Sequence, residues 1–246
     1  MSVKDRVCIV GAASTRFGER FEAGYNDLLV EATFAALADA HASLDAIDAA
    51  WLGTFSTVTA ETGESGASLA DPLALYPKPV TRVENQCVTG TDAFRNACYA
   101  VALGVYDTAL VVGVEKMRDV PPRESMVAAA VRYRHPLLAK GLTSPGVFAL
   151  AATRYLAEHD LDRSILAKVA VKNHQNGSLN PRAHFRRPIT EADALSAPMV
   201  SDPLGLYDCT PTTDGAAAVV VTRPELAHRF TDQPVYVRGI GLATDM

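Results

Sequence analysis

The residue with the clearest chemical potential is Cys87, which stands in the segment Val83-Glu-Asn-Gln-Cys-Val-Thr-Gly-Thr91. The residues before it are typical of a short strand, and those after it are typical of a helix. Cys87 is therefore predicted at a helix N-terminus, where unpaired backbone N–H groups carry partial positive charge. These groups favour the thiolate and can stabilise an oxyanion on an attacked carbonyl. The pattern predicts a nucleophile for acyl transfer, and the alternative is an inert buried thiol.

Four further residues are expected to support Cys87. Asn85 precedes it in the turn, and Gly90 follows it where the missing side chain would let a thioester come close. Asp214 and Gly215 stand before the last long apolar run. The alternative for Asp214 and Gly215 is a tight turn in which the aspartate bonds its local backbone.

Short apolar runs that alternate with helical segments must position these residues. The runs expected to be strands are Val7–Gly11, Ala49–Phe55, Val80–Gln86, Thr108–Val114 and Gly215–Thr222. Such alternation is typical of βαβ units, in which helices cover both faces of the sheet. We therefore predict an α/β fold with a mostly parallel five-stranded sheet and helices on both faces.

The alternation breaks after the fourth strand, which indicates an inserted, mainly helical segment. Helices are expected at Gly146–His159 and Asp162–Gln175, the second ended by Asn176 and Gly177. The expected organisation is a first part of the core at 1–118, the insertion at 119–202, a return to the core at 203–232 and a further segment at 233–246. The last segment contains one more predicted strand, Gln233–Ile240.

Composition excludes several classes of protein. With 246 residues, 48% hydrophobic and 21% charged, the chain is typical of a globular protein with a full core. A net charge of −5 argues against nucleic acid as a partner. No apolar run approaches the roughly 20 residues of a membrane span, and no signal peptide is recognisable. The four scattered cysteines form no C-x-x-C pair, which disfavours a metal site and favours a cytoplasmic location.

Four segments, taken in order, resemble the thiolase family. Glu84–Gly90 resembles its nucleophile motif N-x-C-x-S-G, and Val112–Met117 resembles its G-x-E-x-M segment. Val171–Phe185 is similar to a segment of the sterol-carrier-protein-type thiolases, and Cys209–Ala218 to the motif C-P-x-S-D-G-A-A-A. The four segments occur in the family's order between Glu84 and Ala218, and they also resemble the acetyl-CoA acetyltransferase-like members.

This resemblance implies an acyl-CoA C-acyltransferase. Thiolases transfer an acyl group through a cysteine thioester, in Claisen condensation or in thiolytic cleavage of a β-ketoacyl-CoA, and Cys87 matches the nucleophile. Coenzyme A would be a substrate, with no permanently bound cofactor. Arg186 and His184 would then meet the CoA phosphates, because guanidinium suits phosphate geometry, while Asn173 and His174 would contact substrate or position a water. The alternative for the first pair is a solvated surface. The alternative for the second pair is that it caps the helix and ties the insertion down.

The resemblance also implies that further residues are needed. The activating histidine, the base and the second cysteine of thiolases come from a C-terminal half with G-H-P-x-G and C-x-G segments, and neither segment occurs in this chain. We expect this half to be supplied in cis or in trans, with 233–246 as its beginning and Gln233–Ile240 as a strand without a partner. A homodimer or tetramer and a small OB-fold, zinc-ribbon partner are the expected assemblies.

Two other functions remain compatible with the resemblance. One is a thiolase-like retro-aldolase that cleaves a β-hydroxyacyl-CoA side chain, for example of a sterol, together with a partner subunit. This reaction needs no covalent thioester, so Cys87 could be dispensable. The other is a non-catalytic half-thiolase that acts as a scaffold for another subunit.

Overall fold

The computed structural model describes residues 3–55, 65–121 and 143–243, which divide into two units. The first unit consists of Met1–Met117 and Asp214–Met246, and the second of Arg118–Thr213. We expected the chain to return to the core at 203, but the residues up to Thr213 belong to the second unit. A short β-hairpin and the pair between Arg163 and Asp208, 3.5 Å apart, hold this stretch to the insertion.

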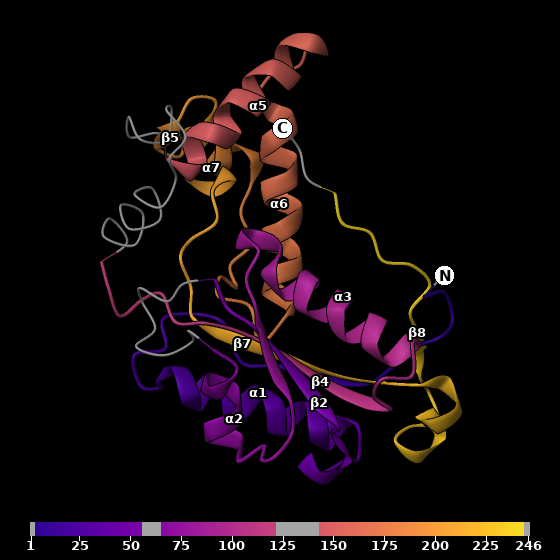
Figure 1. The fold of residues 1–246 in the computed structure, drawn as a ribbon. Helices are drawn as coiled ribbons and strands as arrows, with labels where there is room; N and C mark the ends of the chain where they lie inside the picture. The colour runs from indigo at the N-terminus through magenta and orange to yellow at the C-terminus, as the bar shows by residue number, and fades with distance from the viewer. Residues whose placement is uncertain (1–2, 56–64, 122–142, 244–246) are drawn as a thin grey trace. The chain divides into compact units, whose positions relative to one another are not determined.

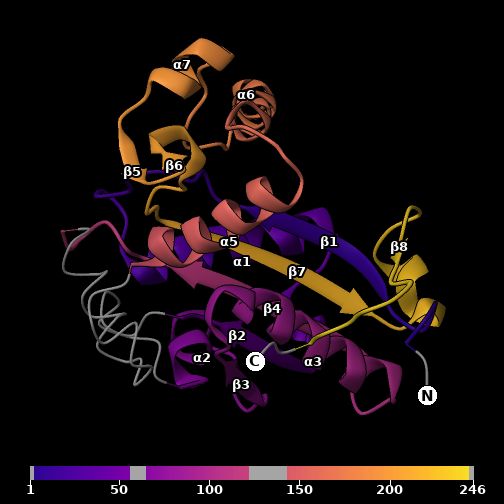
Figure 2. The same ribbon diagram turned by 90° about the horizontal axis from the view of Figure 1, so that it is seen from above.

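The first unit is built on a sheet in the order β3-β2-β4-β7-β1-β8. Its strands are β1 (Cys8–Ser14), β2 (Ala49–Gly53), β3 (Val80–Val83), β4 (Thr108–Glu115), β7 (Gly215–Thr222) and β8 (Val235–Tyr236). β2 pairs in parallel with β3 and β4, while β7 pairs antiparallel with β4 and with β1. Strands β1 to β4 thus share one direction, and β7 runs against them between β4 and β1 (Figure 2). The mostly parallel arrangement of the five long strands is confirmed.

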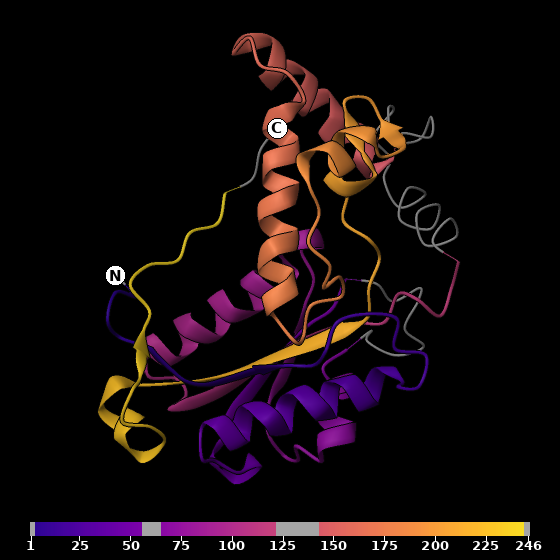
Figure 3. The same cartoon turned by 180° about the vertical axis from the view of Figure 1, so that it is seen from behind.

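Helices cover both faces of this sheet, as predicted. Helices α1 (Tyr25–Asp39) and α2 (Ala67–Leu73) pack on one face, and α3 (Thr89–Ala102) packs on the other (Figures 1 and 3). Side chains alternate along β4, so that Leu110 and Val112 join the core under α1 while Val111 joins the core under α3. Both faces are buried, which explains why the strands appear in the sequence as continuous apolar runs.

The second unit is mainly helical within the described residues. Its elements are α5 (Ser144–Glu158), α6 (Ser164–Leu179), α7 (Glu191–Ser196), β5 (Met199–Ser201) and β6 (Leu204–Gly205). Short 3₁₀ turns lie at Leu44–Ala46, Gln86–Val88 and Pro224–Arg229 in the first unit and at Leu206–Asp208 in the second. No helix in the described parts of the chain is long and apolar enough to cross a membrane.

The predicted end of α6 was wrong. Asn176 and Gly177 do not stop the helix, which continues to Leu179. A Cβ atom at Gly177 would lie 2.8 Å from the carbonyl oxygen of Phe185, so the glycine serves a close approach of two backbones. Packing against the following loop therefore outweighs the local preference of Asn-Gly for a helix end.

The last predicted strand was too long, and its expected isolation was wrong. Only Val235 and Tyr236 form a strand, and they pair antiparallel with Ile9 and Cys8 of β1. The segment therefore extends the sheet of the first unit by a short edge strand. That 233–246 begins a second half stays a prediction.

Helix α1 lies very close to β1 at Gly11. A Cβ atom built on Gly11 would lie 2.5 Å from the carbonyl oxygen of Ala36 and 2.6 Å from the Cβ of Ala40. Ala36 lies in α1 and Ala40 is the residue that caps its C-terminus, so neither atom can rotate away, and both residues are fully buried. Small residues on both elements thus set the distance between the helix and the sheet.

We predict that Gly11→Ala lowers the free energy of unfolding by about 1–3 kcal/mol, because the added methyl group overpacks this contact. Urea unfolding measures the change. Gly239→Ala is the matched control, since a Cβ atom there has no neighbour within 4 Å among the described residues. Equal stabilities of the two variants would contradict the proposed close packing of α1.

Candidate active site

Cys87 lies on an exposed turn between β3 and α3. Strand β3 ends at Val83, three residues before the predicted end, so that Glu84 and Asn85 already lie outside the sheet. Gln86 then adopts a left-handed conformation with φ of 50°, and Gln86–Val88 forms a 3₁₀ turn that leads into α3. Left-handed backbone is unusual for a residue with a side chain, so neighbouring contacts must hold this turn in place.

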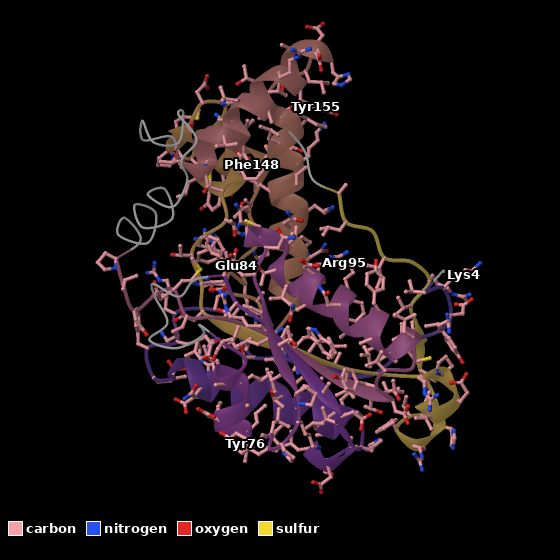
Figure 4. The ribbon with its side chains drawn as sticks, viewed as in Figure 1. Lys4, Tyr76, Glu84, Arg95, Phe148 and Tyr155 are labelled. Carbon is pink, nitrogen blue, oxygen red and sulfur yellow. The ribbon has the colours of Figure 1, made fainter. Side chains whose placement is uncertain are left out.

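Hydrogen bonds on both sides of Cys87 supply these contacts. The backbone N–H of Asn85 donates to Thr89 Oγ1 over 2.8 Å, and the Thr89 hydroxyl donates to the carbonyl oxygen of Gln86 over 2.6 Å. The Glu84 carboxylate accepts the N–H of Gln86 at 2.8 Å. Figure 4 labels Glu84 just before α3 and Arg95 on that helix. The thiol is therefore held at the predicted strand-to-helix turn by its immediate neighbours.

The surroundings of the four cysteines differ sharply. Cys87 is exposed, Cys209 is half-buried, and Cys8 and Cys98 are buried. Burial raises the pKa of Cys98 to about 12. Burial also raises the pKa of Cys8, with help from the charges of Glu225 and Asp5, and the pKa of Cys209, with help from Asp208. In this chain Cys87 is therefore not a buried thiol, and the other three thiols resist ionisation.

Gly90 leaves open space in the first turn of α3. It is exposed, and a Cβ atom there would meet nothing within 4 Å among the described residues. The structure thus provides room beside the start of α3. That a thioester uses this room stays a prediction.

Asp214 is fully buried and accepts hydrogen bonds from distant parts of the chain. Its Oδ2 accepts from Lys116 Nζ at 2.9 Å and from the N–H of Arg20 at 3.0 Å, and its Oδ1 accepts from the N–H of Met117 at 2.7 Å. The expected bonding to local backbone was therefore wrong. The carboxylate joins the residues after β1, the end of β4 and the start of β7.

Gly215 is required by close packing rather than by a turn. A Cβ atom there would lie 2.3 Å from the ring of Phe17. Asp214 and Cys87 lie at the same edge of the sheet, where β3 and β4 end and β7 begins. Three strand spacings separate β3 from β7, about 14 Å. Asp214 and Gly215 therefore hold the adjoining strand ends together, and that they support Cys87 stays a prediction.

The predicted substrate-binding residues lie in the second unit. His174 is on α6, where its Nδ1 lies 3.0 Å from the carbonyl oxygen of Arg187, so this histidine fastens the following loop. The His184 ring stacks on Phe185 with centroids 4.4 Å apart, and the His174 ring lies 6.3 Å from the same phenylalanine.

The remaining two substrate-binding candidates, Asn173 and Arg186, are exposed. Asn173 and His174 do not cap the helix, because α6 (Ser164–Leu179) continues well past both residues, but His174 ties the following loop to α6 as the alternative expected. The structure thus groups His174 and His184 around one phenylalanine and leaves Asn173 and Arg186 at the surface.

Comparison with protein families decides the classification. The family model described as thiolase, N-terminal domain, matches residues 7–225. The chain belongs to the thiolase family. This membership agrees with the α/β architecture, with the helices on both faces of the sheet and with the strand-to-helix turn at Cys87.

Relatives within the thiolase family include archaeal and animal proteins. An acetyl-CoA acetyltransferase of Methanothermobacter thermautotrophicus is 38% identical over 239 residues, which are 97% of this chain and 62% of the relative. Sterol carrier protein 2 of Gallus gallus is 29% identical over 98% of this chain and 46% of its own length. The chain thus spans about half to two thirds of the length of these relatives.

Solved structures show the same fold. The Ltp2-ChsH2(DUF35) aldolase has a TM-score of 0.81 at 26% identity, covering 96% of this chain and 60% of that one. Human mitochondrial 3-ketoacyl-CoA thiolase in complex with CoA has a TM-score of 0.65 at 21% identity, covering 94% and 68%. The thiolase fold is therefore shared well beyond the range of clear sequence similarity.

Sequence reasoning missed three charged residues of this thiolase unit, two on α3 and one at the buried Asp214. Asp92 and Arg95 form a pair on α3, and Lys116 pairs with Asp214. The i, i+3 spacing of Asp92 and Arg95 was a signal for the first pair. No local signal joins Lys116 to Asp214. Within the described residues, no group of three or more His, Cys, Asp or Glu side chains is arranged to hold a metal ion.

We predict that iodoacetamide labels Cys87 before the other three thiols near neutral pH. Cys87 is exposed, whereas burial raises the pKa values of Cys8, Cys98 and Cys209. Peptide mass spectrometry of the folded chain measures the order of labelling, and the same reaction in denaturant provides the control. If Cys98 were labelled as fast as Cys87 in the folded chain, the assignment of an accessible thiol would fail.

We predict that Asp214→Ala lowers the free energy of unfolding by about 3–5 kcal/mol, because it removes the buried carboxylate that accepts from Lys116 Nζ and from two backbone N–H groups. Chemical denaturation measures the loss. Glu158→Ala is the control, since it removes an exposed partner of Arg154 and should change stability by less than about 0.5 kcal/mol. If both variants lost similar amounts of unfolding free energy, the buried pair would stabilise the fold no more than the exposed pair does.

Proposed function

We propose that this chain carries the nucleophile of a thiolase and transfers an acyl group from acyl-CoA through a thioester on Cys87. The observation that supports this most directly is the exposed thiol on a strained turn at the start of α3. The similarity to archaeal acetyl-CoA acetyltransferases supports the same reaction class. Because the chain spans 62% of those relatives, the activity of the whole protein is part of the proposal.

The proposed chemistry begins with attack of Cys87 Sγ on the thioester carbonyl carbon of acyl-CoA. A new C–S bond forms, and the carbonyl oxygen becomes an oxyanion that backbone N–H groups at the start of α3 can stabilise. Collapse of this intermediate breaks the C–S bond to CoA, and CoA leaves as its thiol with the proton that the Cys87 thiol has lost. In condensation, a carbanion of a second acyl-CoA then attacks the acyl-cysteine and releases a β-ketoacyl-CoA. Thiolytic cleavage is the reverse sequence, and CoA acts throughout as substrate without a permanent cofactor.

The proposal assigns the proton transfers to residues outside these 246. The G-H-P-x-G and C-x-G segments of the family do not occur in the chain. We propose that a C-terminal half supplies them, in cis or in trans, and that the assembly is a dimer or a tetramer. Strand β3 supports assembly, because it is the outermost strand on its side of the sheet within the described residues, and an outermost strand can pair with another chain.

We propose that the second unit binds the CoA moiety. Arg186 and Arg187 are exposed, and they follow Phe185 in the segment that returns to α6. The rings of His174 and His184 lie against Phe185. Guanidinium groups suit phosphate, and the aromatic rings offer faces for an adenine base. Asn173 is an exposed polar neighbour on α6.

We predict that incubation of the complete natural gene product with acetyl-CoA adds one acetyl mass to the Cys87 peptide. Mass spectrometry after an acid quench measures the adduct. Cys87→Ser should abolish the adduct on this peptide, and Cys209→Ser, which alters a half-buried thiol, should leave it unchanged. Absence of the adduct in the unaltered protein, or its retention on another cysteine, would contradict the proposed nucleophile.

A retro-aldolase is the second candidate, favoured by the TM-score of 0.81 to the Ltp2-ChsH2(DUF35) aldolase at 26% identity. In this reaction a β-hydroxyacyl-CoA would be cleaved without a covalent thioester, and a small partner subunit of the OB-fold, zinc-ribbon type would be required. The Cys87→Ala variant separates the two candidates. Retained turnover of a β-hydroxyacyl-CoA in this variant would support the aldolase, whereas loss of all acyl transfer supports the thiolase.

A further inference from the structure

Asp92 is a buried carboxylate that connects α3 to the turn of Cys87. Only 8% of its surface is exposed. Its Oδ2 accepts a hydrogen bond from Asn85 Nδ2 at 3.1 Å, and its Oδ1 accepts from Arg95 Nε at 2.8 Å and from Asn96 Nδ2 at 3.1 Å. Two of these donors lie on α3 itself. The third, Asn85, lies two residues before the thiol.

The charge of Asp92 is well compensated. Hydrogen bonding from the Arg95 guanidinium holds the pKa of Asp92 below its ordinary value, and the amides of Asn85 and Asn96 lower it further against the opposing effect of burial. A carboxylate in the first turn of a helix also interacts favourably with the helix dipole. Asp92 is therefore an ionised, fixed acceptor at neutral pH.

The backbone that Asp92 restrains has an uncommon conformation. Asn85 has φ of −151° and ψ of 53°, and Gln86 has φ of 50°. Such conformations persist only where several contacts over-determine them. The bonds through Glu84 and Thr89 involve the turn and the first residue of the helix. The bond from Asn85 to Asp92 reaches further, to a carboxylate that Arg95 and Asn96 hold in place.

We propose that Asp92, held by Arg95, is a positioning residue that orients the turn of Cys87 through the side chain of Asn85. The inference rests on the proposed role of Cys87 as nucleophile and adds a residue that acts on it indirectly. Without the Asp92 acceptor, the Asn85 amide turns to solvent and Gln86 can relax to right-handed backbone. The thiol then loses its fixed direction relative to the N–H groups of α3.

The test compares two variants that both remove the charge of Asp92. Asp92→Asn keeps an oxygen that can accept from the Asn85 amide, whereas Asp92→Ala keeps none. Their difference therefore isolates the hydrogen bond from the change in charge. The rate constant for iodoacetamide alkylation of Cys87 is measured in the folded chain, together with the melting temperature. Asp193→Ala is the matched control, because Asp193 accepts the N–H of Thr190 at the start of α7 in the second unit.

We expect Cys87 in Asp92→Ala to be alkylated about tenfold more slowly than in Asp92→Asn, since a thiol turned away from the N–H groups of α3 loses their stabilisation of the reactive thiolate. In the complete gene product the same pair should differ in kcat, with KM nearly unchanged. Asp193→Ala should leave the alkylation rate at the value of the unaltered chain. Equal alkylation rates in the two Asp92 variants would overturn the proposal.

A second route keeps the inference testable if Asp92→Ala does not fold. Asn85→Ala removes the donor of the same bond and should slow the alkylation of Cys87 to a similar extent. An unchanged rate in Asn85→Ala would overturn the positioning role. Alkylation requires no acyl-CoA, so a failure of Cys87 to accept an acetyl group would reject the proposed function and leave this test independent of it.

Discussion

The buried carboxylate of Asp214 is the interaction on which the edge of the sheet depends. It accepts from the Lys116 ammonium and from the backbone N–H groups of Arg20 and Met117. An unpaired charge in such surroundings would be strongly unfavourable, so all three donors must be in place in the folded chain. Since they follow β1 and β4 and the carboxylate precedes β7, one buried charge holds the adjacent ends of three strands together.

Cys87, the candidate nucleophile, lies at the same end of the strands, but its surroundings differ from those of Asp214. The parallel strands β2, β3 and β4 deliver their carboxyl ends to this edge, and α3 packs across β2 and β4 with its N-terminus there. In open α/β sheets this is the edge where ligands bind. Asp214 is paired in the core, whereas Cys87 is exposed directly after Gln86, whose backbone is left-handed. A rigid scaffold with a strained turn at its rim is the arrangement expected of a reactive group.

Burial distinguishes the exposed thiol of Cys87 from the other three thiols, whose pKa values it raises. Cys98 lies on the sheet-facing side of α3, three turns beyond Cys87, and burial there raises its pKa to about 12. One thiol is therefore exposed just before α3, and a second thiol, on the buried side of α3, is kept in its neutral form. Membership of the thiolase family gives this contrast a chemical meaning, because the exposed thiol is the one that matches the family's nucleophile motif.

Local features of the chain were readable from the sequence alone. Apolar runs predicted β1, β2, β4 and β7, and helical spacing predicted α3. The sequence also placed Cys87 at a turn between a strand and a helix. These features depend on residues close together in the chain. The antiparallel position of β7 between β4 and β1, the continuation of α6 through Gly177 and the partners of Asp214 were decided only by tertiary structure. Strand order and the pairing of a buried charge join residues about a hundred positions apart, and nothing in the local sequence specifies the partner of Asp214 until the chain has folded around it.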